Sequence, residues 1–380
     1  MPKLSRRGRV PPFIVMDVLR AANERQAAGA EVIHLEVGQP GTGAPAGVLA
    51  AAREALDGHR LGYTEALGIP SLRARIARYY AEQYGTRVAP GRVAVTTGSS
   101  AGFVAAFLAA FDEGDRVALA APSYPAYRNI LTTLGIVPVI LDATEATRFQ
   151  PTVELVERAG PIAGLIVASP SNPTGTMLLP QELATIADYC AGAGIRLISD
   201  EIYHGITFGR PAATALDANA DAIVINSFSK YFSMTGWRIG WMIVPEDLVR
   251  PVECLAQNLY ISPPTLSQIA AEAAFEYRAE LDGIVARYAR NRTLLLKELP
   301  AAGFDRLAPA DGAFYLYADV GHLTNNSADF CARMLAEIGV AATPGMDFDA
   351  ERGHRYLRFS FAGSEVDIAK AVEKLKTWRR

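Results

Sequence analysis

The chain has 380 residues, of which 50% are hydrophobic and 20% charged, and its formal net charge is −3. This composition is ordinary for a soluble globular enzyme, and the length favours two domains over a single core. The weak net charge argues against nucleic acid or an acidic membrane surface as a partner. The longest apolar stretch, Gly102–Phe111, is too short to cross a bilayer.

Three cysteines, Cys190, Cys254 and Cys331, lie far apart and form no CxxC pair. This spacing predicts buried free thiols rather than disulfides or a metal site. No apolar segment follows the basic start of the chain, so we expect no secretory signal. These features favour a cytoplasmic protein.

The N-terminal part of the chain predicts an arm, a helix and a short strand. Residues 1–12 are basic and end in two prolines, which is typical of an extended arm. Apolar residues at helical spacing predict a helix over Phe13–Ala28. A strand is expected over Glu31–Val37, and a helix over Ala46–Leu56.

The loop Gly38–Pro45 contains a GxxGxG pattern that resembles a dinucleotide-binding turn. Pro45 follows these glycines directly, and no acidic residue stands at the distance expected for a ribose contact. We therefore discount a dinucleotide site.

Seven short apolar runs follow, most of them separated by stretches long enough for a helix. They are Val93–Thr97, Arg116–Ala120, Val137–Leu141, Gly164–Ala168, Arg196–Ser199, Ala222–Asn226 and Ile239–Val244. Apolar strands that alternate with helices indicate an α/β fold whose mostly parallel sheet is covered on both faces. Ligands of such sheets bind beyond the carboxyl ends of the strands, so the residues after each run are candidates for a site.

The first two runs are followed by residues that suit a flat, phosphorylated ligand. Ser99, Ser100 and Ala101 open an Ala-rich helix, whose free N–H groups and dipole attract phosphate. An ordinary helix cap has the same sequence, however. Tyr124 can stack on a flat ring, although a tyrosine at a strand end is more often simply packed.

The next two strand ends carry an amide and a carboxylate. Asn172 lies between two prolines, so its amide can be aimed with little loss of entropy. Asp200 ends a buried run, where a carboxylate is costly unless a cation meets it. We expect no partner for Asp200 within the protein, so that the cation comes from a ligand. His204 is expected to be partly exposed and to have no role.

The segment Ser227–Trp241 reads SFSKYFSMTGWRIGW and follows the sixth run. Burial on this turn and a nearby cation disfavour the ammonium form of Lys230, so its amine can attack a carbonyl near pH 7. Arg238 offers a planar fork that suits phosphate. An amine beside a phosphate anchor suggests pyridoxal phosphate, whose pyridine nitrogen is the cation that Asp200 needs. Taken alone, the two residues also fit a surface lysine and a snorkelling arginine.

Together these motifs resemble the class I/II aminotransferases of the fold-type I pyridoxal-phosphate enzymes, the aspartate aminotransferase superfamily. The resemblance rests on VGQP at Val37–Pro40, the GYTEALGIPSLR loop, SNPTGT at Ser171–Thr176, SDEIY at Ser199–Tyr203, SFSKYFSMTGWRIGW, and RFSFA at Arg358–Ala362. It implies a large domain, residues 46–280, with a seven-stranded mainly parallel sheet. Residues 1–45 and 281–380 are then an N-terminal arm and a smaller α+β domain.

The resemblance assigns five residues to the cofactor ring. Lys230 is implied to hold the cofactor as a Schiff base and to move the proton at the substrate α-carbon. Asp200 keeps the pyridine nitrogen protonated. Asn172 and Tyr203 hydrogen-bond the ring's 3-oxygen, and Tyr124 stacks on the ring face.

The resemblance also assigns phosphate and substrate contacts. The phosphate ligands within one chain are implied to be Ser99, Ser100, Ala101, Ser227 and Arg238. Tyr63 is implied to reach the phosphate of a neighbouring subunit, which means a homodimer with shared active sites. Arg358 grips the substrate α-carboxylate as a bidentate fork, with Asn172 beside it, and Gly38 adds a backbone contact.

The implied reaction is ping-pong transamination between an amino acid and a 2-oxo acid. A carbon–sulfur β-lyase of the same fold uses the same site and stays open as an alternative. A non-catalytic effector domain of a transcription regulator is disfavoured, because only a short arm precedes the fold. The apolar segments Phe13–Val15 and Tyr260–Pro264 are expected near the substrate side chain, which favours a neutral or aromatic donor.

Overall fold

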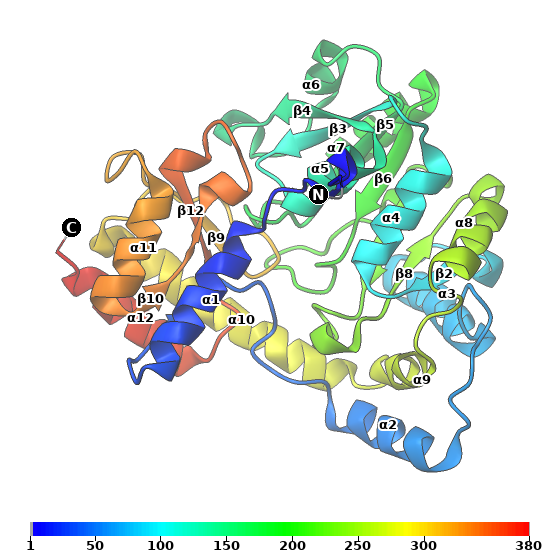
Figure 1. The fold of residues 1–380 in the computed structure, drawn as a ribbon, viewed down its shortest axis with the longest axis horizontal. Helices are drawn as coiled ribbons and strands as arrows, with labels where there is room; N and C mark the ends of the chain where they lie inside the picture. The colour runs from blue at the N-terminus through cyan, green and yellow to red at the C-terminus, as the bar shows by residue number, and fades with distance from the viewer. Residues whose placement is uncertain (1–2, 380) are drawn as a thin grey trace.

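The computed structural model, which describes residues 3–379, is built around a seven-stranded sheet (Figure 1). Its strands are β2 (Val93–Thr96), β3 (Arg116–Ala121), β4 (Val137–Asp142), β5 (Gly164–Ala168), β6 (Arg196–Asp200), β7 (Ile223–Ser227) and β8 (Gly240–Ile243). They lie in the order β2-β8-β7-β6-β5-β3-β4. Every predicted apolar run is therefore confirmed as a strand.

All strand pairs of this sheet are parallel except those of β8, which runs antiparallel to both β2 and β7. The sheet is mainly parallel, as predicted. Alternate residues of one strand enter different cores: Leu165 and Val167 belong to one cluster and Ile166 to the other. Burial on both faces explains why the strands are continuously apolar rather than alternating.

Helices cover both faces of the sheet. One face packs against α4 (Ser99–Ala110), α5 (Pro125–Leu134) and α8 (Glu246–Leu259). The other packs against α3 (Pro70–Tyr84), α6 (Val153–Arg158) and α7 (Pro180–Ala193). Helices α2 (Ala46–Gly58) and α9 (Thr265–Ala274) lie side by side below the sheet in Figure 1.

The long helix α10 (Arg278–Glu298) leads from the sheet to a second, smaller group of elements (Figure 1). Its antiparallel sheet has the order β11-β12-β9, formed by β9 (Tyr315–Asp319), β11 (Thr343–Pro344) and β12 (Tyr356–Ser360). Helices α11 (Ser327–Ile338) and α12 (Glu365–Thr377) belong to the same group.

The N-terminal segment joins this C-terminal group. Strand β1 (Ile33–His34) pairs in parallel with β10 (Val340–Ala341), and α1 (Ile14–Ala27) packs on the same side. The helices predicted over Phe13–Ala28 and Ala46–Leu56 are confirmed as α1 and α2. The predicted strand over Glu31–Val37 shrinks to two residues because β10, its partner, is itself that short.

The remaining sequence expectations concern the arm, the thiols and the membrane. The arm of residues 1–12 carries a short 3-10 turn at Arg6–Gly8, and its first two residues lie outside the described part. All three cysteines are free; Cys190 and Cys331 are buried, but Cys254 is only half-buried. Between residues 3 and 379, no helix is long and apolar enough to span a bilayer.

Candidate active site

A cavity of about 330 Å³ opens at the carboxyl ends of the parallel strands. Among the residues that line it are Gly38, Ser99, Ser100, Tyr124, Asn172, Asp200, Tyr203, Lys230, Arg238 and Arg358. Most of the predicted site residues thus meet in one space, although they come from distant parts of the chain. Ala101, Ser227 and Tyr63 do not line it.

Lys230 lies on the turn after β7, and its Nζ atom donates a hydrogen bond to the Gly38 carbonyl at 2.5 Å. Burial, together with the charges of Arg358 and Arg238, lowers the pKa of Lys230 to about 8, while Asp200 acts in the opposite direction. This is the direction expected from the sequence. About a tenth of the amine is therefore neutral and nucleophilic at pH 7, far more than for an ordinary lysine.

Arg238 and the first turn of α4 form a cradle for an anion. Gly98 precedes α4 with φ +82°, and a Cβ atom there would lie 2.5 Å from Nη2 of Arg238. The guanidinium therefore lies against the helix N-terminus, where free N–H groups point. Ser99 and Ser100 line the cavity at the same place. A cation, a helix dipole and two hydroxyl groups fit a phosphate ester.

Ser227, the predicted phosphate ligand on the same turn as Lys230, does not line the cavity. Its Oγ donates to Oγ of Ser229 at 2.9 Å and lies 3.1 Å from the Ile239 carbonyl, so it braces the turn. Ser229 lines the cavity in its place, and sequence reasoning missed it. The two serines alternate in SFSK, and the pattern alone does not reveal which of them faces the ligand.

Asp200 ends β6 and is 5% exposed. The Tyr127 hydroxyl donates to its Oδ2, and the backbone N–H of Ile202 donates to Oδ1 at 3.0 Å. The prediction that Asp200 has no partner within the protein is therefore wrong, because the first turns of α5 bring Tyr127 beneath the strand end. Burial raises the pKa of Asp200 to about 6, although both hydrogen bonds and Lys230 favour the carboxylate. A buried anion without an adjacent protein cation fits a protonated pyridine nitrogen.

Arg358 reaches the cavity from β12 and is nearly fully buried. Its Nη1 donates to Oδ1 of Asn172 at 2.7 Å, and its Nη2 donates to the Glu36 carbonyl at 2.5 Å. The guanidinium also stacks over the rings of Tyr315 and Phe348, 4.3 and 4.8 Å from their centroids. No acidic side chain pairs with it in the described part of the chain, and its buried Nε has no hydrogen-bond partner there. A carboxylate from a ligand would neutralise the guanidinium and could accept a hydrogen bond from its Nε.

Tyr315 is a cavity residue that the sequence did not single out. Its hydroxyl lies 2.8 Å from that of Tyr203, so the two tyrosines hold each other. A Cβ atom on Gly38 would lie 2.0 Å from this hydroxyl, which explains why glycine stands there. Burial keeps the pKa of Tyr203 well above its usual value. Burial raises the pKa of Tyr315 as well, so both hydroxyls stay neutral. One of them donates to the other, which leaves one O–H free to donate to a ligand.

Two further predicted residues lie apart from this cavity. Tyr63 is 83% exposed and does not line the cavity of its own chain. His204 is buried: its Nε2 hydrogen-bonds the Ser169 carbonyl at 2.9 Å, and its Nδ1 lies 2.7 Å from the Tyr84 hydroxyl. The prediction of a partly exposed histidine is wrong, because His204 packs between Tyr84 and the segment after β5.

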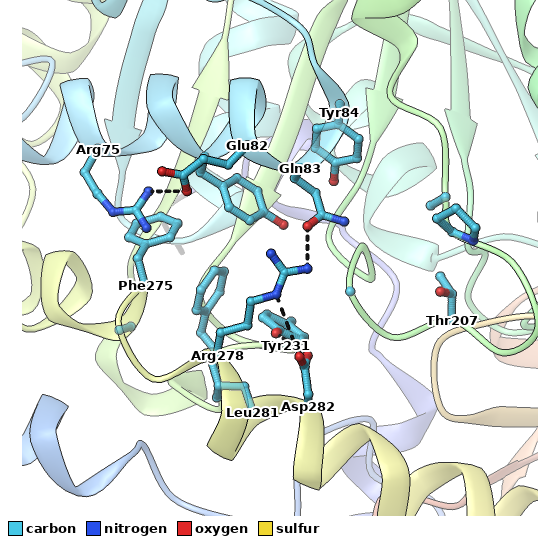
Figure 2. A pocket seen from close by; sticks show the side chains of 16 residues that line it. Arg75, Glu82, Gln83, Tyr84, Thr207, Tyr231, Phe275, Arg278, Leu281 and Asp282 are labelled. Atoms are coloured by element: carbon cyan, nitrogen blue, oxygen red, sulfur yellow. Dashed lines mark hydrogen bonds and ion pairs between the residues drawn. The ribbon is translucent and has the colours of Figure 1, made fainter.

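A second cavity, of about 220 Å³, lies between α3 and the start of α10 (Figure 2). Its charged side chains pair with one another: Arg75 with Glu82 at 3.2 Å, and Arg278 with Asp282 at 3.7 Å. Arg278 also donates a hydrogen bond to the neutral side chain of Gln83 at 2.8 Å. None of the predicted site residues lines it. We therefore assign the chemistry to the first cavity. Within residues 3–379, no group of acidic, histidine or cysteine side chains is arranged to hold a metal ion.

The chain was compared with known proteins. The profile of the aminotransferase class I and II family matches residues 30–375. The valine–pyruvate aminotransferase of Mycobacterium tuberculosis is 52% identical over 99% of this chain and 98% of its own. A crystal structure of an aminotransferase from Mycobacterium tuberculosis superposes with a TM-score of 0.98 at 51% identity, covering 100% of this chain and 99% of that one. The aspartate aminotransferase of Thermus thermophilus with maleate gives a TM-score of 0.92 at 30% identity, with 99% of both chains covered.

Proposed function

Since this chain belongs to the class I and II aminotransferases, a pyridoxal-phosphate-dependent family, we propose that it moves the amino group of a small apolar amino acid to pyruvate by a ping-pong mechanism. One observation carries the proposal. A buried guanidinium without an acidic partner, that of Arg358, shares a cavity with the nucleophilic amine of Lys230 and an apolar wall.

The cavity residues fit pyridoxal phosphate. When bound, this cofactor supplies an electron sink for the charge that develops at the substrate α-carbon. Arg238 and the N-terminus of α4 would hold its phosphate, and Asp200 would face the pyridine nitrogen. Tyr124 would cover one face of the ring, while the hydroxyl of Tyr203 would reach its 3-oxygen.

The chain's own residues orient the substrate and move its proton. Arg358 binds the α-carboxylate, so the α-hydrogen is directed toward Lys230. The Lys230 amine takes the proton from the substrate α-carbon and would deliver it to C4′ of the cofactor, which its lowered pKa permits near neutral pH. With the oxo acid, the same amine would move the proton in the reverse direction. Phe13 and Val15 line the cavity and would help to exclude water from the reacting atoms when a substrate is bound.

The lining favours an apolar donor over a dicarboxylic one. Four consecutive or nearby apolar residues of the N-terminal segment line the cavity: Phe13, Val15, Met16 and Val37. The cations of the described lining are Lys230, Arg238 and Arg358. In this proposal they serve proton transfer, the cofactor phosphate and the substrate α-carboxylate, respectively. Among the described residues of this chain that line the cavity, no cation is left for a second carboxylate. The name of the Mycobacterium tuberculosis relative supports valine as donor and pyruvate as acceptor.

We further propose a cytoplasmic homodimer in which Tyr63 completes the site of the other subunit. The exposure of Tyr63 supports this arrangement, as do the exposed apolar side chains of Leu56 and Ile261. The large domain would span residues 46–280, and residues 1–45 and 281–380 would form the smaller one. The free cysteines fit a reducing compartment.

A panel of amino donors tests this proposal. With pyruvate as acceptor, catalytic efficiency should be at least about 100-fold higher for valine than for aspartate, because an unpaired carboxylate in the cavity costs several kcal/mol. Alanine formation measures the rate. A preference for aspartate would contradict the proposed donor class. Pyruvate release from β-chloroalanine without an oxo acid would instead indicate the lyase activity.

Replacement of Arg358 by lysine tests the α-carboxylate contact. The charge stays but the fork is lost, so catalytic efficiency should fall by a similar factor for every amino acid, corresponding to about 2–5 kcal/mol. A simple amine without a carboxylate should hardly be affected. A loss confined to dicarboxylic donors would make Arg358 a side-chain contact instead.

A further inference from the structure

Helix α1 begins without a cap of its own. The residue at its N-cap position, Phe13, makes no side-chain hydrogen bond to the first turn, where Ser, Thr, Asp or Asn is usual. Instead, Asp347 supplies the acceptors from the far end of the chain. Its Oδ1 accepts from the N–H of Ile14 at 3.1 Å, and its Oδ2 accepts from the N–H of Val15 at 3.2 Å. Asp347 is 2% exposed, so these bonds are shielded from water.

The turn that Asp347 holds is also the apolar wall of the active site. Phe13, Val15 and Met16 line the cavity, and the Phe13 ring lies 5.8 Å from that of Tyr124. The position of this wall thus depends on a carboxylate that does not line the cavity itself.

Asp347 is in turn fixed to the parts of the site that bind polar groups. Nη2 of Arg128, on α5, donates to the Asp347 carbonyl at 2.8 Å. The next residue, Phe348, accepts from the N–H of Ser123 at 3.1 Å, directly before Tyr124. The Phe348 ring also lies under the guanidinium of Arg358. One short segment therefore ties together the apolar wall, the carboxylate anchor and the segment that carries the stacking tyrosine.

We infer that Asp347 is a positioning residue for substrate specificity: its carboxylate fixes α1 at the distance from Arg358 that suits a branched apolar side chain. This inference rests on the proposed function. A gap of 0.5–1 Å between two atoms already removes about a quarter to a half of their van der Waals attraction. A pocket that fits one methyl group more or less well discriminates by about 10- to 200-fold. Small displacements of α1 are thus enough to change selectivity.

The experiment compares Asp347→Asn with Asp349→Asn in the holoenzyme. Asp349 is a matched control, because it is buried in the same segment but accepts from Glu351 and Arg352 rather than from α1. Alanine serves as amino donor, and pyruvate release is followed with either 3-methyl-2-oxobutanoate, the oxo acid of valine, or the unbranched 2-oxobutanoate. Hydrogen–deuterium exchange of the α1 peptide reports on the helix directly, without reference to activity.

In Asp347→Asn, selectivity for the branched acid should fall about tenfold, mainly through KM, and exchange of the first turn of α1 should accelerate. Asp349→Asn should leave both quantities near wild type, whatever its melting temperature. The double variant Val15→Ala, Asp347→Asn should be as selective as the less selective of the two single variants. The two effects should not add, because both changes affect the same wall.

Three outcomes would overturn the inference: unchanged exchange at α1, faster exchange with unchanged selectivity, or an equal loss for both acids. A wild-type enzyme inactive with valine and pyruvate would instead refute the proposed function. The exchange measurement would then still test the clamp, with selectivity measured on whichever substrate pair the donor panel identifies.

Discussion

Replacing Lys230 with alanine should abolish transamination, by on the order of 10⁴-fold or more, and still leave a folded protein that binds pyridoxal phosphate without a covalent bond. Lys230 is the one lysine in the described lining of the cavity, so no second amine can take its place. The phosphate cradle at Arg238 and α4 is untouched. The variant loses one hydrogen bond to the Gly38 carbonyl, but it also loses a partly buried cation that is costly to bury, so the fold should be kept.

Borohydride reduction followed by peptide mapping checks this assignment. The label should appear on Lys230 in the wild type and should be absent from the variant. Lys297, whose side chain is 78% exposed, provides a matched control: Lys297→Ala should keep full activity and labelling. Label on any lysine other than Lys230 would refute the assignment.

The lowered pKa of Lys230 adds a pH test with a defined sign. An ordinary lysine titrates near pH 10.4, whereas Lys230 loses its proton near pH 8. In the cofactor-free protein, the rate of covalent uptake of pyridoxal phosphate should therefore rise with pH and level off above about 8. A rate that still climbs toward pH 10 would mean that the amine is not perturbed.

Replacing Asp200 with alanine should lower activity by about 10³-fold, because the charge that faces the pyridine nitrogen is lost. The same change leaves the Tyr127 hydroxyl without its acceptor, at a cost of about 1–3 kcal/mol of stability. Part of this cost is offset because a carboxylate whose pKa is raised by burial is itself unfavourable in the fold.

Asp200→Asn separates the two effects. Asparagine keeps one acceptor oxygen, for either the Tyr127 hydroxyl or the Ile202 N–H, so the melting temperature should fall less than with alanine, whereas activity should fall nearly as far. Absorbance of the bound cofactor gives an independent readout of the ring nitrogen. Near-normal turnover in either variant would show that the nitrogen does not face Asp200.

The strands could be predicted because their signal is local. An apolar run such as Gly164–Ala168 is buried on both faces wherever its neighbours lie. The antiparallel direction of β8 could not be predicted in this way, since it depends on how the chain returns between β2 and β7. Similarly, β1 has only two residues because its partner, from the other end of the chain, is equally short.

Site residues at strand ends could be predicted because a parallel sheet gathers them at one edge. The residues that were missed act through contacts between distant segments. Tyr127 meets Asp200 only because the first turn of α5 lies near the end of β6, and Tyr315 meets Tyr203 across the two groups of strands. Asp347 and the first turn of α1 are more than 300 positions apart. No spacing rule in the sequence links the two members of such a pair, so these contacts become known only from the folded structure.

The antiparallel return from β7 to β8 has a consequence for how this enzyme can diversify. Lys230 and Arg238, the two residues proposed to anchor the cofactor, lie on one connection between the paired strands β7 and β8. The substrate contacts of Arg358 and α1 belong to the other group of strands and to the N-terminal segment. Substitutions around Arg358 and α1 can therefore change donor preference without changing the residues on the β7–β8 connection that are proposed to bind the cofactor. An engineer who wishes to exchange the substrate should randomise the lining of α1 and leave the β7–β8 connection unaltered.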